Sequence, residues 1–435
     1  MAATADAIVV GAGVIGASVA LELARSGRTV VSVDKASGPG EGSTSASSAI
    51  VRFNYSTWDG VAAAWESKHC WERWDDHVQL GDGTALARFR RTGMVVLDAP
   101  VVPHKRVVSI FDEVGVPYEA WDPATLRQRV GGIDTGRYGP PKPVRDAAFF
   151  ADADGQLGGL FTPDAGFVDD PRLAAGNLAS AAAREGAQFV FRRSVVEVGR
   201  RGRRVTGIVL SDGSRIDAPV LVNAAGPWSS AFNRMAGVGA DFTVAVRPMR
   251  QEVHQVDAPP GYEAPSGLGP SIADPDLGTY LRAAPGGKLL VGGIEPDCDP
   301  LEWIDDPDVA DQRPTAACFE AQVMRAARRF PRLTIPNSPK GVAGVYDVAD
   351  DWTPIYDRTD LDGFYVAIGT SGNQFKNAPL VGQFIARLVE RVEAGQDHDT
   401  DPVRFSCVHT GHVINLGTFS RKRPFNSASS GTVMG

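Results

Sequence analysis

The chain opens with an apolar run, a glycine-rich turn and an apolar helical pattern. Residues 7–10 predict a short buried strand, residues 11–16 carry three glycines, and residues 17–24 are rich in alanine and leucine, as in a helix. A glycine at position 27 ends this helix, and residues 29–33 predict a second strand that ends at Asp34. This order of elements predicts a βαβ unit of the Rossmann type.

The hydrophobic pattern of the remaining chain predicts further helices and strands. Helices are expected over residues 62–80, 107–114, 174–184, 314–330 and 380–393. Strands are expected over residues 91–97, 188–191, 195–198, 204–210, 215–217, 220–223, 244–256, 278–293 and 363–368. Turns at Gly202 and Gly213 predict an antiparallel meander of three strands, and the apolar run 220–222, followed by Asn223, predicts a parallel strand buried on both faces.

These patterns predict an α/β (α+β) fold with two domains. The first, a dinucleotide-binding domain with a parallel sheet and an antiparallel meander, is expected to comprise residues 1–90, 145–240 and 341–400. The second, built on a mostly antiparallel sheet, is expected to comprise residues 91–144 and 241–340. Residues 401–435 are expected to form a polar C-terminal arm.

Composition and charge restrict the classes of partner. The chain has 435 residues, of which 43% are hydrophobic and 22% charged, as in an ordinary globular protein. A net charge of −8 disfavours nucleic acid, and no apolar run reaches the length of a membrane span. The start of the chain lacks a signal-peptide pattern, and its four cysteines are widely separated. We therefore expect a cytoplasmic monomer or homo-oligomer with no membrane partner, disulfide framework or metal site.

The first glycine-rich turn has the spacing of a dinucleotide site. Gly11 permits the tight turn, Gly13 lets backbone N–H groups approach a pyrophosphate, and Gly16 lets the helix pack against the strand. Asp34 stands where a carboxylate can accept the hydroxyls of a ribose. Glycine-rich turns also occur for structural reasons alone, but the strands, helix and acid in register favour a nucleotide site.

Three other stretches carry groups that could contact a ligand. Residues 37–49 are small and polar, typical either of a surface loop or of a loop that wraps phosphate and ribityl oxygens. Arg52 follows as a candidate anion anchor, although a surface arginine is the commoner case. Residues 223–229 and 369–377 are small-residue turns that follow predicted strands, where backbone N–H groups face a ligand crevice.

Five motifs, taken together, resemble one enzyme family. They are residues 11–16 with Asp34, residues 42–44 (Gly-Ser-Thr), residues 223–229 (Asn-Ala-Ala-Gly-Pro-Trp-Ser), residues 344–347 (Gly-Val-Tyr-Asp) and residues 369–376 (Gly-Thr-Ser-Gly-Asn-Gln-Phe-Lys). In this order they are similar to the FAD-dependent amine oxidoreductases related to D-amino-acid oxidase, in the branch of sarcosine oxidase, glycine oxidase and dimethylglycine dehydrogenase. The resemblance covers residues 6–393.

The resemblance implies a set of site residues. Arg52 and Lys376 would pair with the substrate carboxylate, while Tyr280 and Tyr346 would line the pocket; a structural role for the cations and core packing for the tyrosines are the alternatives. The residues implied to contact FAD are Gly11, Gly13, Val14, Ile15, Gly16, Asp34, Lys35, Ser43, Thr44, Val196 (on the adenine side), Ala225, Gly226, Trp228, Gly344, Gly372, Asn373, Gln374, Phe375 and Lys376.

The sequence also departs from the family pattern. Where dimethylglycine dehydrogenases carry the flavin on a histidine there is Ala46, and where monomeric sarcosine oxidase uses a cysteine there is Gly344, so we expect noncovalent FAD. Leu290 aligns with the lysine that promotes reaction with O₂ in sarcosine oxidases, and Lys288 lies nearby on the same face of the strand. Slow reaction with O₂, and hence another electron acceptor, is the resulting expectation.

The function implied by the resemblance is oxidation of the C–N bond of an amino or N-alkylamino acid, with hydride transfer to flavin N5 and hydrolysis of the imine. The partners would be a small amino-acid-like substrate and O₂ or another electron acceptor. Oxidation of a C–OH bond in a 2-hydroxy acid, and a flavin-holding subunit of a heteromeric oxidase, are the alternatives. A nicotinamide enzyme is disfavoured because residues 369–376 would have no role there.

Overall fold

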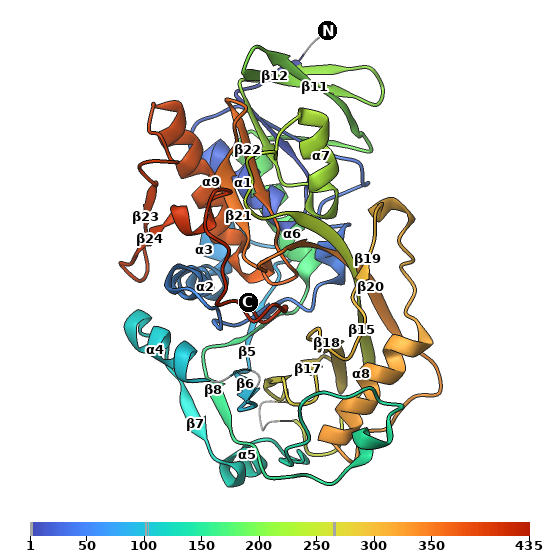
Figure 1. Ribbon diagram of the computed structural model, residues 1–435. Helices are drawn as coiled ribbons and strands as arrows, with labels where there is room; N and C mark the ends of the chain where they lie inside the picture. Colours follow the sequence, from blue (N-terminus) through green and yellow to red (C-terminus); the bar gives the residue numbers. More distant parts are fainter. Residues whose placement is uncertain (1–2, 101, 103, 264–266) are drawn as a thin grey trace.

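The protein has two sheet-based domains, seen in a computed structural model that describes residues 3–100, 102, 104–263 and 267–435 (Figure 1). A mixed, mostly parallel sheet lies in the upper half of the view, and a larger, mostly antiparallel sheet lies in the lower half. The predicted two-domain α/β architecture is therefore confirmed.

The first sheet has six strands and contains the predicted βαβ unit. Its strands, in spatial order, are β10 (Gln188–Phe191), β3 (Val30–Asp34), β2 (Ala7–Val10), β14 (Val220–Asn223), β22 (Phe364–Ile368) and β21 (Ile355–Arg358). All neighbours are parallel except β21 and β22. Strand β14 is buried along its length between β2 and β22, as the apolar run 220–222 predicts.

Three helices pack together against this sheet: α1 (Val14–Arg25), α6 (Pro171–Arg184) and α9 (Ala378–Glu393) (Figure 1). Helix α1 contacts both of the others. Small residues permit this close packing, since a Cβ atom added to Gly382 of α9 would lie 2.4 Å from the backbone oxygen of Ser18 in α1.

The predicted meander is confirmed, and it forms a separate small sheet. Its strands are β11 (Val195–Arg201), β12 (Arg204–Leu210) and β13 (Arg215–Asp217), with β1 (Ala3–Thr4) added in parallel beside β13. The neighbouring strand β10 pairs with β3 in the six-stranded sheet instead.

The larger sheet has nine strands: β19 (Glu302–Trp303), β15 (Val246–Asp257), β18 (Lys288–Gly293), β17 (Thr279–Ala284), β16 (Ser271–Asp274), β6 (Met94–Leu97), β8 (Gly159–Thr162), β7 (Glu119–Trp121) and β20 (Gly341–Ala349). Strand β20 pairs with β15 over its whole length. Helix α8 (Ala316–Arg329) packs on this sheet. Strands β8 and β20 belong to this sheet, although they fall in ranges expected for the first domain. The expected domain limits stay a prediction.

The remaining elements surround the two sheets. The other helices are α2 (Trp58–Glu72), α3 (Trp74–Val78), α4 (His104–Val114), α5 (Pro123–Arg129) and α7 (Ser229–Ala236), and the other strands are β4 (Ile50–Val51), β5 (Phe89–Arg91), β9 (Gly166–Val168), β23 (Arg404–Ser406) and β24 (Val413–Asn415). The helix predicted over residues 62–80 is interrupted at Arg73. The strand predicted over residues 91–97 is divided at Gly93, whose φ of +74° turns the chain.

The C-terminal arm is packed against the first domain. Ile414 and Leu416 are fully buried, and Arg421 is 1% exposed. The guanidinium of Arg421 pairs with Asp357 at 3.1 Å and with Asp399 at 2.7 Å. The sequence pattern did not reveal this packing, because the arm is rich in polar residues and lacks a helical or strand period.

No helix in the described part of the chain combines the length and the apolar character needed to cross a bilayer.

The Arg421 network provides a test of how the arm is held. We expect Arg421→Met to lower the free energy of unfolding by about 3–5 kcal/mol, because it leaves the carboxylate of Asp357 buried and unpaired. Urea unfolding of the purified protein measures this. Arg387→Met, which removes the exposed pair with Glu390, is the control and should cost less than about 0.5 kcal/mol. Equal midpoints for the two variants would contradict the assignment.

Candidate functional site

One cavity of about 1000 Å³ brings the sequence-predicted residues together. Residues from both large sheets line it. The predicted residues that line the cavity are Gly11, Gly13, Val14, Ile15, Asp34, Lys35, Ser43, Thr44, Arg52, Ala225, Gly226, Trp228, Tyr280, Gly344, Tyr346, Gly372, Asn373, Gln374, Phe375 and Lys376.

The first end of the cavity is formed by the turn between β2 and α1. Gly11 has a φ of +108°, and a Cβ atom there would lie 2.3 Å from the backbone oxygen of Ala224. Gly16 is outside the cavity wall, and a Cβ atom on it would lie 1.9 Å from the oxygen of Gly11. The two glycines therefore allow backbone atoms to lie close together, and the N-terminus of α1 faces the cavity.

Asp34, at the end of β3, fixes the shape of this turn. One carboxylate oxygen accepts the N–H of Ala12 at 2.7 Å, and the other accepts the N–H of Ala36 at 2.8 Å. Each carboxylate oxygen has a second lone pair available for a ligand hydroxyl.

Lys35 and Trp228 lie together at the same end. The ammonium of Lys35 lies 3.8 Å from the centre of the Trp228 ring and pairs with Asp308, which also accepts the Trp228 indole N–H at 3.0 Å. Asp308 comes from the second domain, so this cluster joins the two halves of the cavity wall.

Val196 does not line the cavity; its side chain is 53% exposed, while Val195 beside it is part of the wall. Neighbouring side chains of a strand point to opposite faces, and the register between β11 and β12 shifts between Val195 and Glu197. Of these two residues, Val195 and not Val196 is part of the described cavity wall, and a contact of Val196 with the adenine side stays a prediction.

The middle of the cavity is formed by the turn η1 (Ser43–Ala46) and strand β20. The Thr44 hydroxyl accepts the N–H of Val14 at 3.1 Å, and the Ser43 hydroxyl donates to the backbone oxygen of Val345 at 2.5 Å. A Cβ atom added to Gly344 would lie 2.8 Å from the Cβ atom of Ala46. Ala46 and Gly344, the two positions at which the resemblance would place a covalent flavin bond, are therefore neighbours here, and neither carries a nucleophilic side chain.

The far end of the cavity is formed by residues 372–376. Gly372 has a φ of +66°, and a Cβ atom there would lie 2.3 Å from the ring of Tyr346. Helix α2 supports this loop from behind, because the Ser67 hydroxyl and the Trp71 indole N–H each donate to the backbone oxygen of Lys376 at 2.7 Å. Trp71 is 2% exposed, as expected of a core tryptophan.

Tyr55 connects this loop to the rest of the site, and no motif or period in the sequence predicts this role. Its hydroxyl donates to the backbone oxygen of Asn373 at 2.6 Å and accepts from the side-chain amides of Gln374 and Asn377 at 3.2 and 3.3 Å. Its ring lies 5.4 Å from the Arg52 guanidinium and 4.9 Å from the Lys376 ammonium. Both basic groups thus lie near the same aromatic ring.

Arg52 and Lys376 are both buried, at 5% and 2% exposure. Arg52 donates to the backbone oxygens of Asn54, Val433 and Met434, and Lys376 donates to the oxygen of Asn373 at 2.5 Å. Among the described residues, neither cation forms an ion pair with a carboxylate. Burial, followed by the positive charge of Arg52, lowers the pKa of Lys376 well below its usual value.

Glu295 is a further group at this end that the sequence did not indicate. It is 8% exposed and accepts the N–H of Val433 at 2.7 Å and the Gln251 amide at 3.0 Å. Burial raises the pKa of Glu295 to about 8, against a smaller opposing effect of Arg52. Its carboxyl group is therefore mostly protonated at neutral pH and does not neutralise Arg52.

Tyr280 and Tyr346 stand on strands of the second domain and face the cavity. The Tyr280 hydroxyl forms a hydrogen bond of 2.7 Å with the Ser48 hydroxyl, and burial raises the pKa of Tyr280 to about 12. Both phenols therefore remain neutral at physiological pH.

Leu290 and Lys288 do not line the cavity. The ammonium of Lys288 pairs with Asp257 on the neighbouring strand at the surface. The lysines that line the described cavity are Lys35 at one end and Lys376 at the other.

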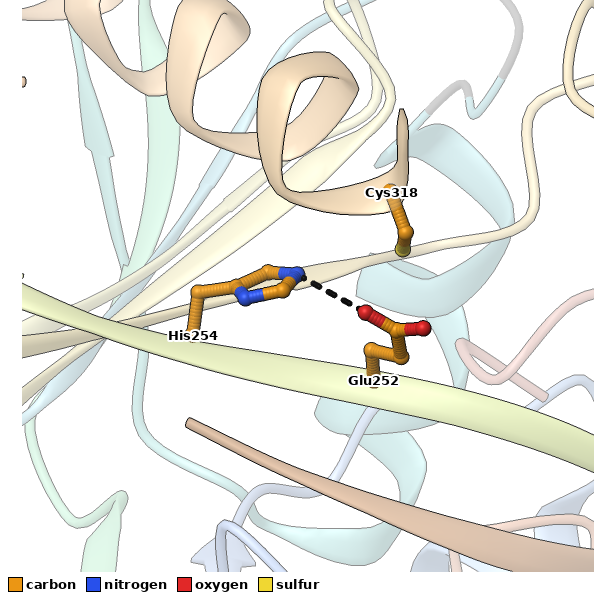
Figure 2. A group of neighbouring side chains, drawn as sticks. All are labelled: Glu252, His254 and Cys318. Carbon is orange, nitrogen blue, oxygen red and sulfur yellow. Dashed lines mark ion pairs between the residues drawn. The ribbon is translucent and has the colours of Figure 1, made fainter. Parts of the chain in front are cut away.

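A separate polar cluster lies under α8, outside the cavity wall (Figure 2). Glu252 and His254 of β15 and Cys318 of α8 place ligand-type atoms within 4.8 Å of one another. The Glu252 carboxylate accepts from Arg250 at 2.6 Å and from the N–H of Thr315 at 2.8 Å, and it lies 3.3 Å from the His254 ring. Burial raises the pKa of the Cys318 thiol to about 12. The cluster is a buried ion-pair network that joins α8 to the sheet, and the absence of a metal stays a prediction.

The cavity residues fit an extended dinucleotide. The glycine turn and the N-terminus of α1 suit a pyrophosphate, and Asp34 suits a ribose. The small residues 42–49 line the middle of the cavity, and backbone groups of residues 372–376 line its other end. The cavity continues from this loop to Arg52, which leaves room for a small second molecule beside the cofactor.

Curated relatives share parts of this sequence. FAD-dependent oxidoreductase domain-containing protein 1 of Bos taurus is 30% identical over 40% of this chain and 36% of its own length. The glycine oxidase of Geobacillus kaustophilus (strain HTA426) is 25% identical over 90% of this chain and 94% of its own length. The chain therefore spans about a third of the first relative and nearly all of the second.

A solved structure, that of L-proline dehydrogenase from P. horikoshii, has the same fold. It is 21% identical, covers 97% of this chain and 98% of its own, and superposes with a TM-score of 0.75. The model of the DAO family, described as FAD dependent oxidoreductase, matches residues 6–388. With a match over most of its length, the chain belongs to this family of FAD-dependent oxidoreductases.

Proposed function

We propose that this protein uses noncovalently bound FAD to oxidise the C–N bond of an amino or N-alkylamino acid, with Arg52 and Lys376 as the carboxylate anchors. The observation that carries the proposal is the pair of buried cations without an anionic partner among the described residues. A buried charge is costly unless it is paired. A carboxylate ligand supplies the missing charge for both groups.

The neighbouring groups suit a small zwitterionic or anionic substrate. A planar guanidinium and an ammonium hold a carboxylate in a fixed position and orientation. Tyr280 and Tyr346 provide the walls next to it and keep water away from the reacting carbon. FAD, when bound, supplies the two-electron acceptor for the reaction.

The chain's own residues then contribute mainly by positioning. Arg52 and Lys376 fix the carboxylate, and this places the α-carbon beside residues 372–376. At this end the described cavity wall includes no histidine, and its carboxyl group Asp347 already accepts hydrogen bonds from the N–H and hydroxyl of Thr370 while burial raises its pKa. We expect the amine to bind in its neutral form. Two relatives support an amino-acid substrate by their names, glycine oxidase and L-proline dehydrogenase.

An activity panel tests the reaction class. We expect turnover of sarcosine, glycine, proline or a related amino acid with a dye acceptor, and slower turnover with O₂, because Lys288 is turned away from the cavity. Dye reduction and hydrogen peroxide release are measured in parallel. Turnover of 2-hydroxy acids but of no amine would refute C–N oxidation, and peroxide formation as fast as dye reduction would refute the slow reaction with O₂.

Arg52→Met tests the anchor. We expect kcat/KM for the amino-acid substrate to fall by roughly 100- to 1000-fold, equivalent to about 3–4 kcal/mol, mainly through KM. The matched control is Arg282→Met, which removes another buried arginine outside the cavity wall. An unchanged KM in Arg52→Met would remove this residue from the substrate site.

The change in protonation of Lys376 on ligand binding provides a test of its role as an anchor. A bound carboxylate stabilises the charged ammonium and raises the lowered pKa of Lys376, so binding of benzoate should take up a proton above that lowered pKa. Affinity for benzoate should therefore fall as pH rises. Calorimetry in buffers of different ionisation enthalpy measures the uptake.

Three variants separate the groups that titrate in this test. Lys376→Met should lose the proton uptake, whereas Lys68→Met, at a buried lysine paired with Glu72, should retain it. Glu295→Gln removes the contribution of the carboxyl whose pKa lies near 8. Equal uptake by the wild type and Lys376→Met would refute the role of Lys376.

The mode of FAD attachment has a direct test. Ala46 and Gly344 lack a nucleophile, and the described wall contains no cysteine or histidine. We therefore expect acid precipitation to leave the flavin in the supernatant and a colourless pellet. Flavin that stays with the polypeptide would contradict noncovalent binding.

A further inference from the structure

The last residues of the chain lie in the substrate end of the cavity. Val433 and Met434 are 9% and 6% exposed, and both line the cavity with Arg52. Their two consecutive backbone oxygens accept hydrogen bonds from the Arg52 guanidinium. This contact joins residues about 380 positions apart in the sequence.

The contacts of Arg52 leave one part of its guanidinium for a ligand. Nη1 donates to the oxygens of Asn54 and Met434, and Nη2 donates to the oxygen of Val433. A guanidinium has five N–H donors, so three are engaged by these carbonyls, and the remaining two are on Nε and Nη2. Two donors on neighbouring nitrogens match the two oxygens of a carboxylate.

The segment is held at both of its ends. Before it, Arg423 pairs with Asp351 at 2.8 Å, and the Asn426 amide donates to the hydroxyls of Ser56 and Thr353. After a stretch of small residues from 427 to 432, the N–H of Val433 donates to the buried carboxyl of Glu295. This hydrogen bond from Val433 to Glu295 holds the backbone next to the two carbonyl groups that accept from Arg52.

The side chain of Met434 gives the segment a second role. Met434 is part of the cavity wall, as are Tyr280 and Tyr346, and it belongs to the same buried apolar cluster as Tyr280, against which Tyr346 packs. A thioether side chain is flexible and apolar and fills the space next to a small apolar substituent.

We propose that residues 427–435 complete the substrate pocket: the backbone oxygens of Val433 and Met434 position Arg52 so that its remaining donors face the substrate carboxylate, and the Met434 side chain limits the size of the substrate. The inference rests on the proposed role of Arg52 as the carboxylate anchor. Val433 and Met434 act as positioning residues, and Met434 also determines specificity.

Deletion of residues 427–435 tests the positioning role, with benzoate as the probe and benzamide as the uncharged probe of the same shape. We expect the Kd of benzoate to rise at least about tenfold, because Arg52 loses two of its three acceptors, while the weak binding of benzamide stays unchanged. Binding is followed by the perturbation of the flavin absorbance and by calorimetry. Flavin content and melting temperature show whether the variant is folded.

Two further variants test the same positioning role in case the deletion impairs folding. Val433→Gly combined with Met434→Gly retains the chain length but removes the two apolar side chains that hold the segment, and it should weaken benzoate in the same direction. Phe425→Ser, at an exposed position before the segment, should leave benzoate binding unchanged.

Met434→Ala tests the specificity role. We expect it to lower KM for N-methyl amino acids with larger side chains relative to sarcosine, with kcat nearly constant, and Met434→Leu should restore the wild-type preference. An unchanged preference in Met434→Ala would overturn the role of this side chain.

The outcomes separate this inference from the proposed function. If benzoate binds the wild type through Arg52 and the deletion leaves its Kd unchanged, the positioning role is wrong and the anchor stands. If the deletion tightens binding, the segment competes with the ligand, and the inference is likewise overturned. If Arg52→Met itself leaves benzoate binding unchanged, the anchor fails and the inference fails with it.

Discussion

Two buried basic groups, Arg52 and Lys376, which form no ion pair with a carboxylate in the part of the chain that the structure describes, set the conditions at the proposed substrate end of the cavity. Backbone oxygens and one aromatic ring partly replace the water that Arg52 and Lys376 lose. These groups come from the segment after β4, the loop before α9 and the end of the chain. The architecture around the site therefore brings distant carbonyls to these two basic groups, and the proposed carboxylate ligand would complete their neutralisation.

The parts of the fold that the sequence predicted are those with a local pattern. The βαβ unit, the meander and the buried strand at residues 220–223 each carry a period or a turn within a few residues. The same holds for most of the cavity wall, because the glycine turns and the loop at residues 372–376 follow strands whose ends lie along one edge of a sheet. Helix α2 was expected, but not its break at Arg73.

The parts that the sequence did not predict depend on contacts between distant residues. Tyr55, Glu295 and Met434 have no periodic position, and each acts through a backbone group or a cavity that only the folded chain creates. Val196 lies outside the cavity wall for a local reason, since a shift of one residue on a strand turns a side chain to the other face. The packing of the arm depends on buried arginine pairs, which resemble surface charges in a sequence.

Backbone strain gathers near the same site. Ala49, Glu295 and Ser371 have φ values of +49°, +51° and +47°, in a region that side-chain-bearing residues rarely adopt. Ala49 lies in the cavity wall, Glu295 holds the N–H of Val433, and Ser371 precedes the loop at residues 372–376. Such strain costs on the order of 1–3 kcal/mol per residue and persists where surrounding contacts fix the chain.

Strand β20 has a consequence for how the protein can move. It pairs with β15 in register from Val246 to His254, and its own residues Gly344 and Tyr346 form part of the cavity wall. A hinge rotation that separated the two sheets would leave this ladder intact, because both strands belong to the larger sheet, but it would carry Gly344 and Tyr346 away from the first domain. The cavity wall is thus complete only while the two sheets keep their relative position.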